Sequence, residues 1–234
     1  MPINQPARRL WTEFCAKHEI ASTAVPLFDC DGALRVSIKT VGRALQRPVL
    51  RRSSEMEKLV ISQTDLLVQD WEQQSFAYDG LIYMMFRKEK NVAGKNVVVP
   101  LYIGKTETIG RRGDLSANIR NLARDKSKFA RWGDNYAYHI GDLSAVVLPG
   151  HAPQKQTDKY KSWAEALFRE SPAAAPRLRK PVYFWTTAWK PTSVGIWEEF
   201  GETRLTFLEY LLIGVASAAF PDSQLNREGQ NRFV

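Results

Sequence analysis

The feature that most constrains the fold is a pair of strand candidates separated by a polar loop. Segments 80–87 (GLIYMMFR) and 97–104 (VVVPLYIG) are rich in β-branched and aromatic residues, which favour extended backbone. The polar stretch between them contains Gly94, a residue type common in turns. These segments predict an antiparallel hairpin, and 182–189 (VYFWTTAW) is the most strand-like segment of the remaining chain.

Apolar residues at steps of three and four predict helices on both sides of these strands, which indicates an α+β protein. The predicted helices are 6–20, 54–74, 114–132, 159–171 and 202–220. Segment 136–148 (YAYHIGDLSAVVL) is predicted to be a strand or a hairpin.

The charge balance predicts an anionic partner. The chain has 33 Lys and Arg against 25 Asp and Glu, a net charge of +8, and nucleic acid is the commonest polyanion that such a surface attracts. The longest apolar run, 210–220, is too short to span a membrane, and the N-terminal segment lacks the apolar stretch of a signal peptide. Cys15 and Cys30 have no metal-binding spacing and fit a reducing compartment, so a cytoplasmic protein is expected.

Two local patterns are unusual for a structural protein. The second strand ends in Tyr102 and is followed closely by the cations Lys105, Arg111 and Arg112. In the strongest helix, Glu209 lies beside an apolar stripe, where an ionised carboxylate is costly unless it meets a cation, hydrogen-bond donors or a metal. A glutamate at the margin of the stripe that reaches water or an arginine is the alternative.

The order of these elements resembles the GIY-YIG nuclease family. The elements are LIY at 81–83, YIGK at 102–105, Arg112, Glu209 on the later helix and Asn226 after that helix. Leucine replaces the glycine of the first signature. The histidine that several family members place one turn after the arginine is also absent, because that position falls near a serine.

The resemblance implies a small antiparallel three-stranded sheet with flanking helices, formed by strands at about 80–87, 97–104 and 182–189. Under this division, 78–234 is the nuclease core, with an insertion at about 133–180. The extension 1–77 is then a DNA-recognition or dimerisation part.

The resemblance also implies a divalent-metal-dependent DNA endonuclease that leaves 5′-phosphate and 3′-hydroxyl ends. Glu209 would hold Mg²⁺ or Mn²⁺, and the guanidinium of Arg112 would contact the phosphate oxygens. Tyr83 or Tyr102 would position or deprotonate the attacking water, and Lys105 would lower a phenol pKa or take the proton itself. The choice among these three groups stays open.

For each remaining candidate residue, a functional role and an ordinary structural role are both open. Asn226 completes the catalytic set in the family, but it also suits a simple turn. Basic residues after the second strand would track DNA phosphates, or would form a solvated surface. His139 would face the DNA, or would be a hydrogen-bonded structural histidine. These DNA-binding candidates are Arg111, Arg120, Arg124, Lys128, Arg131 and His139.

The size of the additions to the core favours a sequence-specific enzyme that acts on double-stranded DNA, similar to type II restriction endonucleases. Such an enzyme would be a homodimer if it cuts both strands. The alternatives are a structure-specific repair or mobile-element nuclease, or a DNA-binding module that keeps the GIY-YIG shape without activity.

Overall fold

A computed structural model of the chain describes residues 4–42, 47–91, 94–124 and 139–227. The described residues form one four-stranded antiparallel sheet in the order β1-β6-β4-β5 and a separate two-stranded sheet, β2-β3. The strands of the main sheet are β1 (Val25–Pro26), β4 (Gly80–Lys90), β5 (Asn96–Glu107) and β6 (Tyr183–Trp189). The smaller sheet contains β2 (Ile38–Val41) and β3 (Arg47–Leu50).

The α+β class and the three main strand segments predicted from the sequence are confirmed. The sheet differs from the three-stranded expectation because the backbone of Val25 and Pro26 pairs with the outer side of β6. A sheet specific to the GIY-YIG family stays a prediction.

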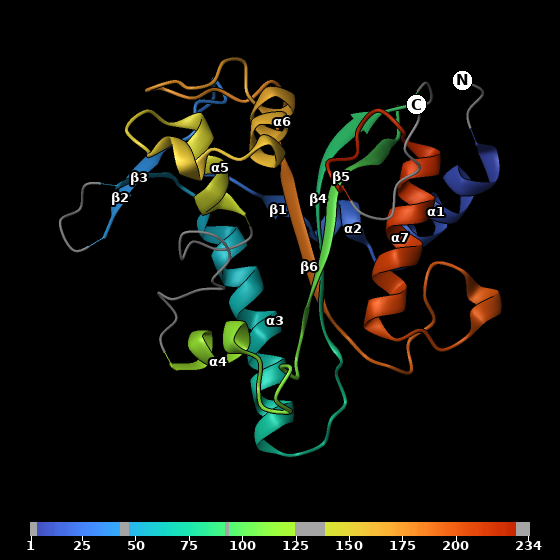
Figure 1. Cartoon of the computed structure of the whole chain (residues 1–234). Coiled ribbons are helices and arrows are strands. Elements are labelled where there is room, and N and C mark those ends of the chain that lie inside the picture. Colours follow the sequence, from blue (N-terminus) through green and yellow to red (C-terminus); the bar gives the residue numbers. More distant parts are fainter. Residues whose placement is uncertain (1–3, 43–46, 92–93, 125–138, 228–234) are drawn as a thin grey trace.

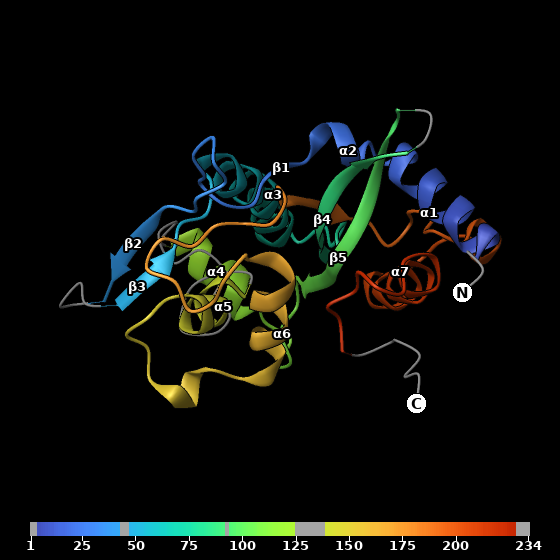
Figure 2. The same ribbon diagram turned by 90° about the horizontal axis from the view of Figure 1, so that it is seen from above.

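Helices cover both faces of the main sheet, as Figures 1 and 2 show. The helices are α1 (Gln5–Lys17), α2 (Ile20–Thr23), α3 (Ser54–Glu72), α4 (Ala117–Arg124), α5 (Ile140–Val147), α6 (Asp158–Leu167) and α7 (Leu205–Ala219). Short 3₁₀ turns occupy Pro153–Lys155 and Glu198–Phe200. Local sequence explains two helix starts, since the side chain of Asn4 accepts a hydrogen bond from the first turn of α1 and that of Ser53 does the same for α3.

Alternation along β4 decides which helices meet which face. Ile82 and Met84 point towards α1 and α7 and share their apolar core. Tyr83 and Met85 point the other way, into the core formed with α3, α5 and α6. Because successive side chains of a strand point to opposite faces, the sheet separates these two cores.

Helix α5 contradicts the prediction that 136–148 is a strand or hairpin. Its residues from Gly141 onward are almost all buried, so the segment reads as a continuous apolar run. Periodicity does not distinguish a helix that is buried all round from a buried strand, and Ile140–Val147 is such a helix, whereas 136–138 lie outside the described residues. The helix predicted over 114–132 is described as α4, and its predicted continuation from 125 lies outside the described residues.

Candidate functional site

The two signature tyrosines lie side by side on one face of the sheet. Tyr83 of β4 pairs with Gly104 of β5, and Tyr102 occupies the next position along β5 on the same face. The centroids of the two phenol rings are 6.1 Å apart. A Cβ atom on Gly104 would lie only 2.5 Å from the Cζ and Oη atoms of Tyr83. The glycine of the YIG sequence therefore leaves the space that the Tyr83 ring fills.

His139, which precedes α5, and two residues of α6 complete a cluster around these phenols. The Nε2 atom of His139 lies 3.5 Å from the Tyr83 Oη, and its Nδ1 atom lies 2.6 Å from the Tyr160 Oη. The His139 ring also packs against the rings of Tyr102 and Trp163, with centroid distances of 4.8 and 5.3 Å. We call these five residues the tyrosine cluster. His139, predicted as a DNA contact, belongs to it.

Burial controls the electrostatics of the tyrosine cluster. Loss of solvent lowers the pKa of His139 to about 3, and the nearby ammonium of Lys159 acts in the same direction. Burial also raises the pKa of Tyr160, with further contributions from the charge of Asp142 and a hydrogen bond to its carboxylate. Both groups are therefore neutral near pH 7. The same Lys159 ammonium lies 5.3 Å from the centroid of the Tyr102 ring.

Helix α7, which carries Glu209, packs on the opposite face of the sheet. Leu208 and Leu212, on either side of Glu209, are buried in the core shared with α1. Glu209 itself is half-buried. The tyrosine cluster and the helix of the predicted metal ligand thus belong to the two different cores that the sheet separates.

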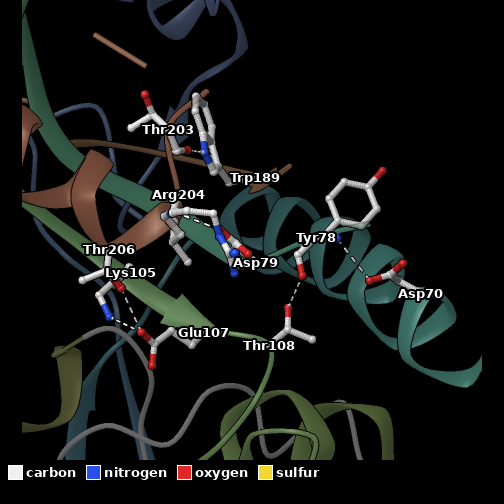
Figure 3. Close-up of polar contacts among 11 residues, drawn as sticks. Asp70, Tyr78, Asp79, Lys105, Glu107, Thr108, Trp189, Thr203, Arg204 and Thr206 are labelled. Atoms are coloured by element: carbon white, nitrogen blue, oxygen red, sulfur yellow. Dashed lines mark hydrogen bonds and ion pairs between the residues drawn. The ribbon is translucent and has the colours of Figure 1, made fainter. Parts of the chain in front are cut away.

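A polar junction fixes the N-terminal end of α7 against the sheet (Figure 3). The Oδ2 atom of Asp79 accepts hydrogen bonds from the Arg204 Nε (2.7 Å) and from the backbone N–H of Leu205 (3.0 Å). The Oε1 atom of Glu107 accepts from the Lys105 Nζ (2.7 Å) and from the Thr206 Oγ1 (3.0 Å). We call Asp79, Lys105, Glu107, Arg204 and Thr206 the α7 junction.

The α7 junction puts Lys105 on the same side of the sheet as α7, the helix that carries the predicted metal ligand, Glu209. Lys105 and Tyr102 are three residues apart in β5, so they point to opposite faces, and Lys105 lies on the α7 side. The hydrogen bond from Lys105 is the largest contribution that lowers the pKa of Glu107. Glu209 follows Thr206 by one helical turn, on the same side of α7.

Asn226 makes two hydrogen bonds to the backbone of β5. Its Oδ1 atom accepts from the N–H of Ile103 (3.0 Å), and its Nδ2 atom donates to the Ile103 carbonyl (2.8 Å). The N–H of Leu225 donates to the carbonyl of Leu101 (2.7 Å). This segment therefore runs along the outer edge of β5 beside the signature tyrosine, and the amide of Asn226 fills the place of a strand partner for Ile103.

The predicted arginines lie outside the tyrosine cluster. Arg111 and Arg112 are exposed in the turn between β5 and α4. Arg120 forms an ion pair with Asp114 (2.8 Å). The backbone of Arg124 ends α4, whereas Lys128 and Arg131 lie outside the described residues.

Few of the described side chains are grouped in a way that would coordinate a metal ion. Within the described ranges, no group of three or more His, Cys, Asp or Glu residues could hold a metal ion. Mg²⁺ commonly takes one or two carboxylates and fills its remaining positions with water and substrate phosphate. A single glutamate such as Glu209 fits that requirement, and it would give a site that substrate completes.

Sequence reasoning missed Asp142, Lys159, Tyr160 and Trp163 as members or neighbours of the site. Tyr160 and Trp163 have the helical spacing of ordinary core residues. Their connection with His139 and Tyr102 is a tertiary contact of α6 with the residue before α5 and with β5. No spacing in the sequence signals it.

Comparisons with protein-family models, with curated proteins and with solved structures found no match to this chain. Among the described helices, none is long and apolar enough to cross a membrane.

Proposed function

We propose that this protein is a divalent-metal-dependent DNA endonuclease that hydrolyses a phosphodiester bond to 5′-phosphate and 3′-hydroxyl ends. The observation that carries the proposal is the packing of Tyr83 and Tyr102 on paired strands, with Gly104 directly beneath the Tyr83 ring. This packing gives a physical reason for the YIG spacing. The net charge of +8 supports a polyanionic substrate.

In this proposal the scissile phosphate lies at the outer edge of β5, near Gly104 and Lys105. β5 ends the order of the main sheet, so its outer edge is not paired with another described strand. The hydrogen bonds of the segment around Asn226 reach along this edge as far as Ile103. A phosphate just beyond that point would lie at the edge between the face that carries Tyr102 and the face that carries Lys105.

In this proposal, the residues of this chain have the following catalytic roles. A tyrosine hydroxyl orients the attacking water, while Lys105 and the exposed guanidinium of Arg112 offset charge on the phosphate oxygens. Glu209 would hold the metal, which when bound supplies a positive charge that stabilises the leaving oxygen. Asn226 keeps the edge of β5 in place beside the phosphate.

The test is cleavage of supercoiled plasmid in Mg²⁺, with Glu209→Gln compared against Glu199→Gln, a change at an exposed glutamate outside the site. Loss of a group that stabilises the transition state costs on the order of a hundredfold in rate or more. Glu209→Gln is therefore expected to abolish measurable cleavage while DNA binding persists, and Glu199→Gln is expected to cleave normally. Equal cleavage by both variants would remove Glu209 from the site.

A second candidate function is DNA binding without cleavage. It is favoured by the location of α7, which packs on the sheet face opposite to the two phenols. This candidate predicts salt-sensitive binding to DNA and intact plasmid in Mg²⁺ and in Mn²⁺. The plasmid assay therefore separates the two candidates without any variant.

Within the nuclease proposal, a sequence-specific cytoplasmic enzyme of the type II restriction kind, dimeric when it cuts both strands, is the favoured subtype. It predicts discrete plasmid fragments and a dimer in sedimentation experiments. Cleavage confined to branched or damaged substrates would instead indicate a repair or mobile-element nuclease.

A further inference from the structure

We propose that a cavity at the N-terminal end of α7 binds one nucleobase that carries an amino group, which means adenine, cytosine or guanine. The base would come from an unpaired nucleotide of DNA or from a free nucleotide. The chemistry of the cavity stands on its own contacts. A source in DNA, beside the place of cleavage, rests on the proposed nuclease function.

The cavity lies between three segments that are distant in sequence. These are the loop between α3 and β4, the residues that end and follow β5, and the start of α7. Its volume is about 290 Å³, near the lower end of the roughly 300–1,000 Å³ of ligand pockets, which suits one ring system rather than a large cofactor. Four residues of the α7 junction line it, namely Asp79, Glu107, Arg204 and Thr206 (Figure 3).

Two large apolar side chains line the cavity and are about half exposed. Phe76, from the loop before β4, is 50% exposed, and Ile109, which follows β5, is 47% exposed. Proteins that bind single bases stack them on aromatic and apolar side chains. The cavity therefore offers the kind of surface that the flat face of a base requires.

The loop holds Phe76 in a strained conformation. Its φ angle of 50° lies in the left-handed region, which is rare for a bulky residue. The buried carboxylate of Asp70 fixes the loop by accepting hydrogen bonds from the Ser75 Oγ (2.5 Å) and from the N–H groups of Ala77 (2.7 Å) and Tyr78 (3.2 Å). Backbone strain that the surroundings enforce is concentrated at functional sites. Here it presents an aromatic ring at the cavity before any ligand binds.

The polar side chains of the cavity suit the edge of a base. The Asp79 Oδ2 and the Glu107 Oε1 each accept two hydrogen bonds, and a carboxylate has about four acceptor sites. Both carboxylates therefore keep capacity for an amino group, which adenine, cytosine and guanine carry and thymine lacks. The exposed guanidinium of Arg204 supplies donors for the acceptor atoms of the same base.

The charges around the cavity favour a neutral ligand. Arg204 pairs with Asp79 and Lys105 pairs with Glu107, each at 2.7 Å. The two carboxylates disfavour a phosphate inside the cavity, and the two paired cations offset the attraction for a basic side chain of another protein. A neutral ring with both donors and acceptors satisfies these groups. The net charge of +8 attracts the nucleic acid that would supply it.

The first test is an amide ¹H–¹⁵N NMR titration with nucleosides, which carry no phosphate. Cytidine and adenosine are expected to shift the signals of residues 76–79 and 107–109 in a saturable way, and thymidine is expected to shift them less. Absence of a saturable shift at these residues would overturn the proposal. A shift with N-acetyl-arginine methylamide and with no nucleoside would also overturn it, because the occupant would then be a protein side chain.

The second test removes the stacking ring. Phe76→Gly is expected to lose on the order of tenfold or more in affinity for cytidine, the usual effect of losing a stacking partner. Its urea midpoint is expected to stay close to that of the wild type, because glycine adopts a positive φ without strain. Phe200→Ala, which removes a 52% exposed ring outside the cavity, is the control and should bind cytidine normally. Equal affinity of Phe76→Gly and the wild type would overturn the proposal.

The source of the base is decided with DNA. Tighter binding of a short duplex with one unpaired cytosine than of the fully paired duplex, lost in Phe76→Gly, would assign the cavity to DNA. Equal binding of the two duplexes, with saturable binding of cytidine monophosphate, would assign it to a free nucleotide. The plasmid assay is independent of these results. Protein that binds nucleosides without cleaving DNA keeps the base-binding cavity and loses the proposed nuclease function, whereas cleavage without nucleoside binding overturns the cavity alone.

Discussion

At the scale of single residues, two small contacts hold the signature strand in place. Gly104 accommodates the ring of Tyr83 by having no side chain, and Asn226 satisfies both backbone polar groups of Ile103. Neither effect depends on charge or on metal. These residues therefore have structural roles that can be measured even in protein that shows no activity.

Gly104→Ala is expected to destabilise the fold. The new methyl group would overlap the Tyr83 ring, and overpacking of this kind typically costs about 1–3 kcal/mol. Urea denaturation measures the change. Gly214→Ala is the matched control, because a Cβ there meets no atom within 4 Å and alanine favours a helix, so this variant is expected to be neutral or slightly more stable.

Asn226→Ala is expected to cost about 1–3 kcal/mol of stability, because two backbone groups of Ile103 lose their partners in a buried place. Asn226→Asp keeps the acceptor but sets a carboxylate oxygen against the Ile103 carbonyl in a buried place, so a loss at least as large is expected. Denaturation curves of both variants provide the measurement. Wild-type stability in Asn226→Ala would show that water replaces the amide and that the residue matters for another reason.

At the scale of secondary structure, α7 begins where it does because of a residue far away in sequence. The N-cap residue, Arg204, makes no side-chain capping bond. Asp79, which immediately precedes β4, instead accepts from the Leu205 N–H at the first residue of the helix. The start of the helix is thus tied to the sheet, and the location of Glu209 is tied with it.

Asp79→Ala is expected to lose about 1–2 kcal/mol, the usual effect of removing a helix cap. Arg204→Ala tests whether the ion pair or the cap dominates. The Arg204 side chain is 75% exposed and that of Asp79 is 12% exposed, so the ion pair itself should contribute about 0–1 kcal/mol. A double-mutant cycle from denaturation data separates the two contributions. Equal losses in both single variants would assign the effect to the ion pair instead.

At the scale of the whole molecule, the sheet divides the protein into two cores with different chemistry. The core towards α1 and α7 consists mainly of apolar side chains, whereas the core towards α5 and α6 also contains the polar contacts of the tyrosine cluster. Burial of His139 in the second core links the stability of the entire fold to pH. The expected direction of this linkage is a loss of stability in acid.

Stability is expected to fall as the pH decreases from about 6.5, the pKa of an unfolded histidine. The pKa of His139 in the folded protein is lowered to about 3, so between these values the unfolded chain binds a proton that the folded chain excludes. Above this range both forms are neutral and the residue contributes no pH dependence. Urea denaturation at about pH 7 and about pH 4.5 measures the slope.

His139→Asn should reduce this slope without abolishing it. Burial and the charge of Lys17 also lower the pKa of His18, which contributes with the same sign. The double variant with His18→Asn is the corresponding control. An unchanged slope in His139→Asn would show that the His139 ring accepts a proton readily in the folded state.

The sequence by itself determined the α+β class, the three main strands and the helices around them, because these depend on local periodicity and residue type. It also brought together Tyr83 and Tyr102, since strand pairing follows from a hairpin. The tertiary structure alone decided that α5 is a helix, that His139 meets Tyr160, and that α7 packs on the face opposite to the phenols. These features depend on which apolar face each element buries against a distant partner, and one-dimensional spacing does not contain that information.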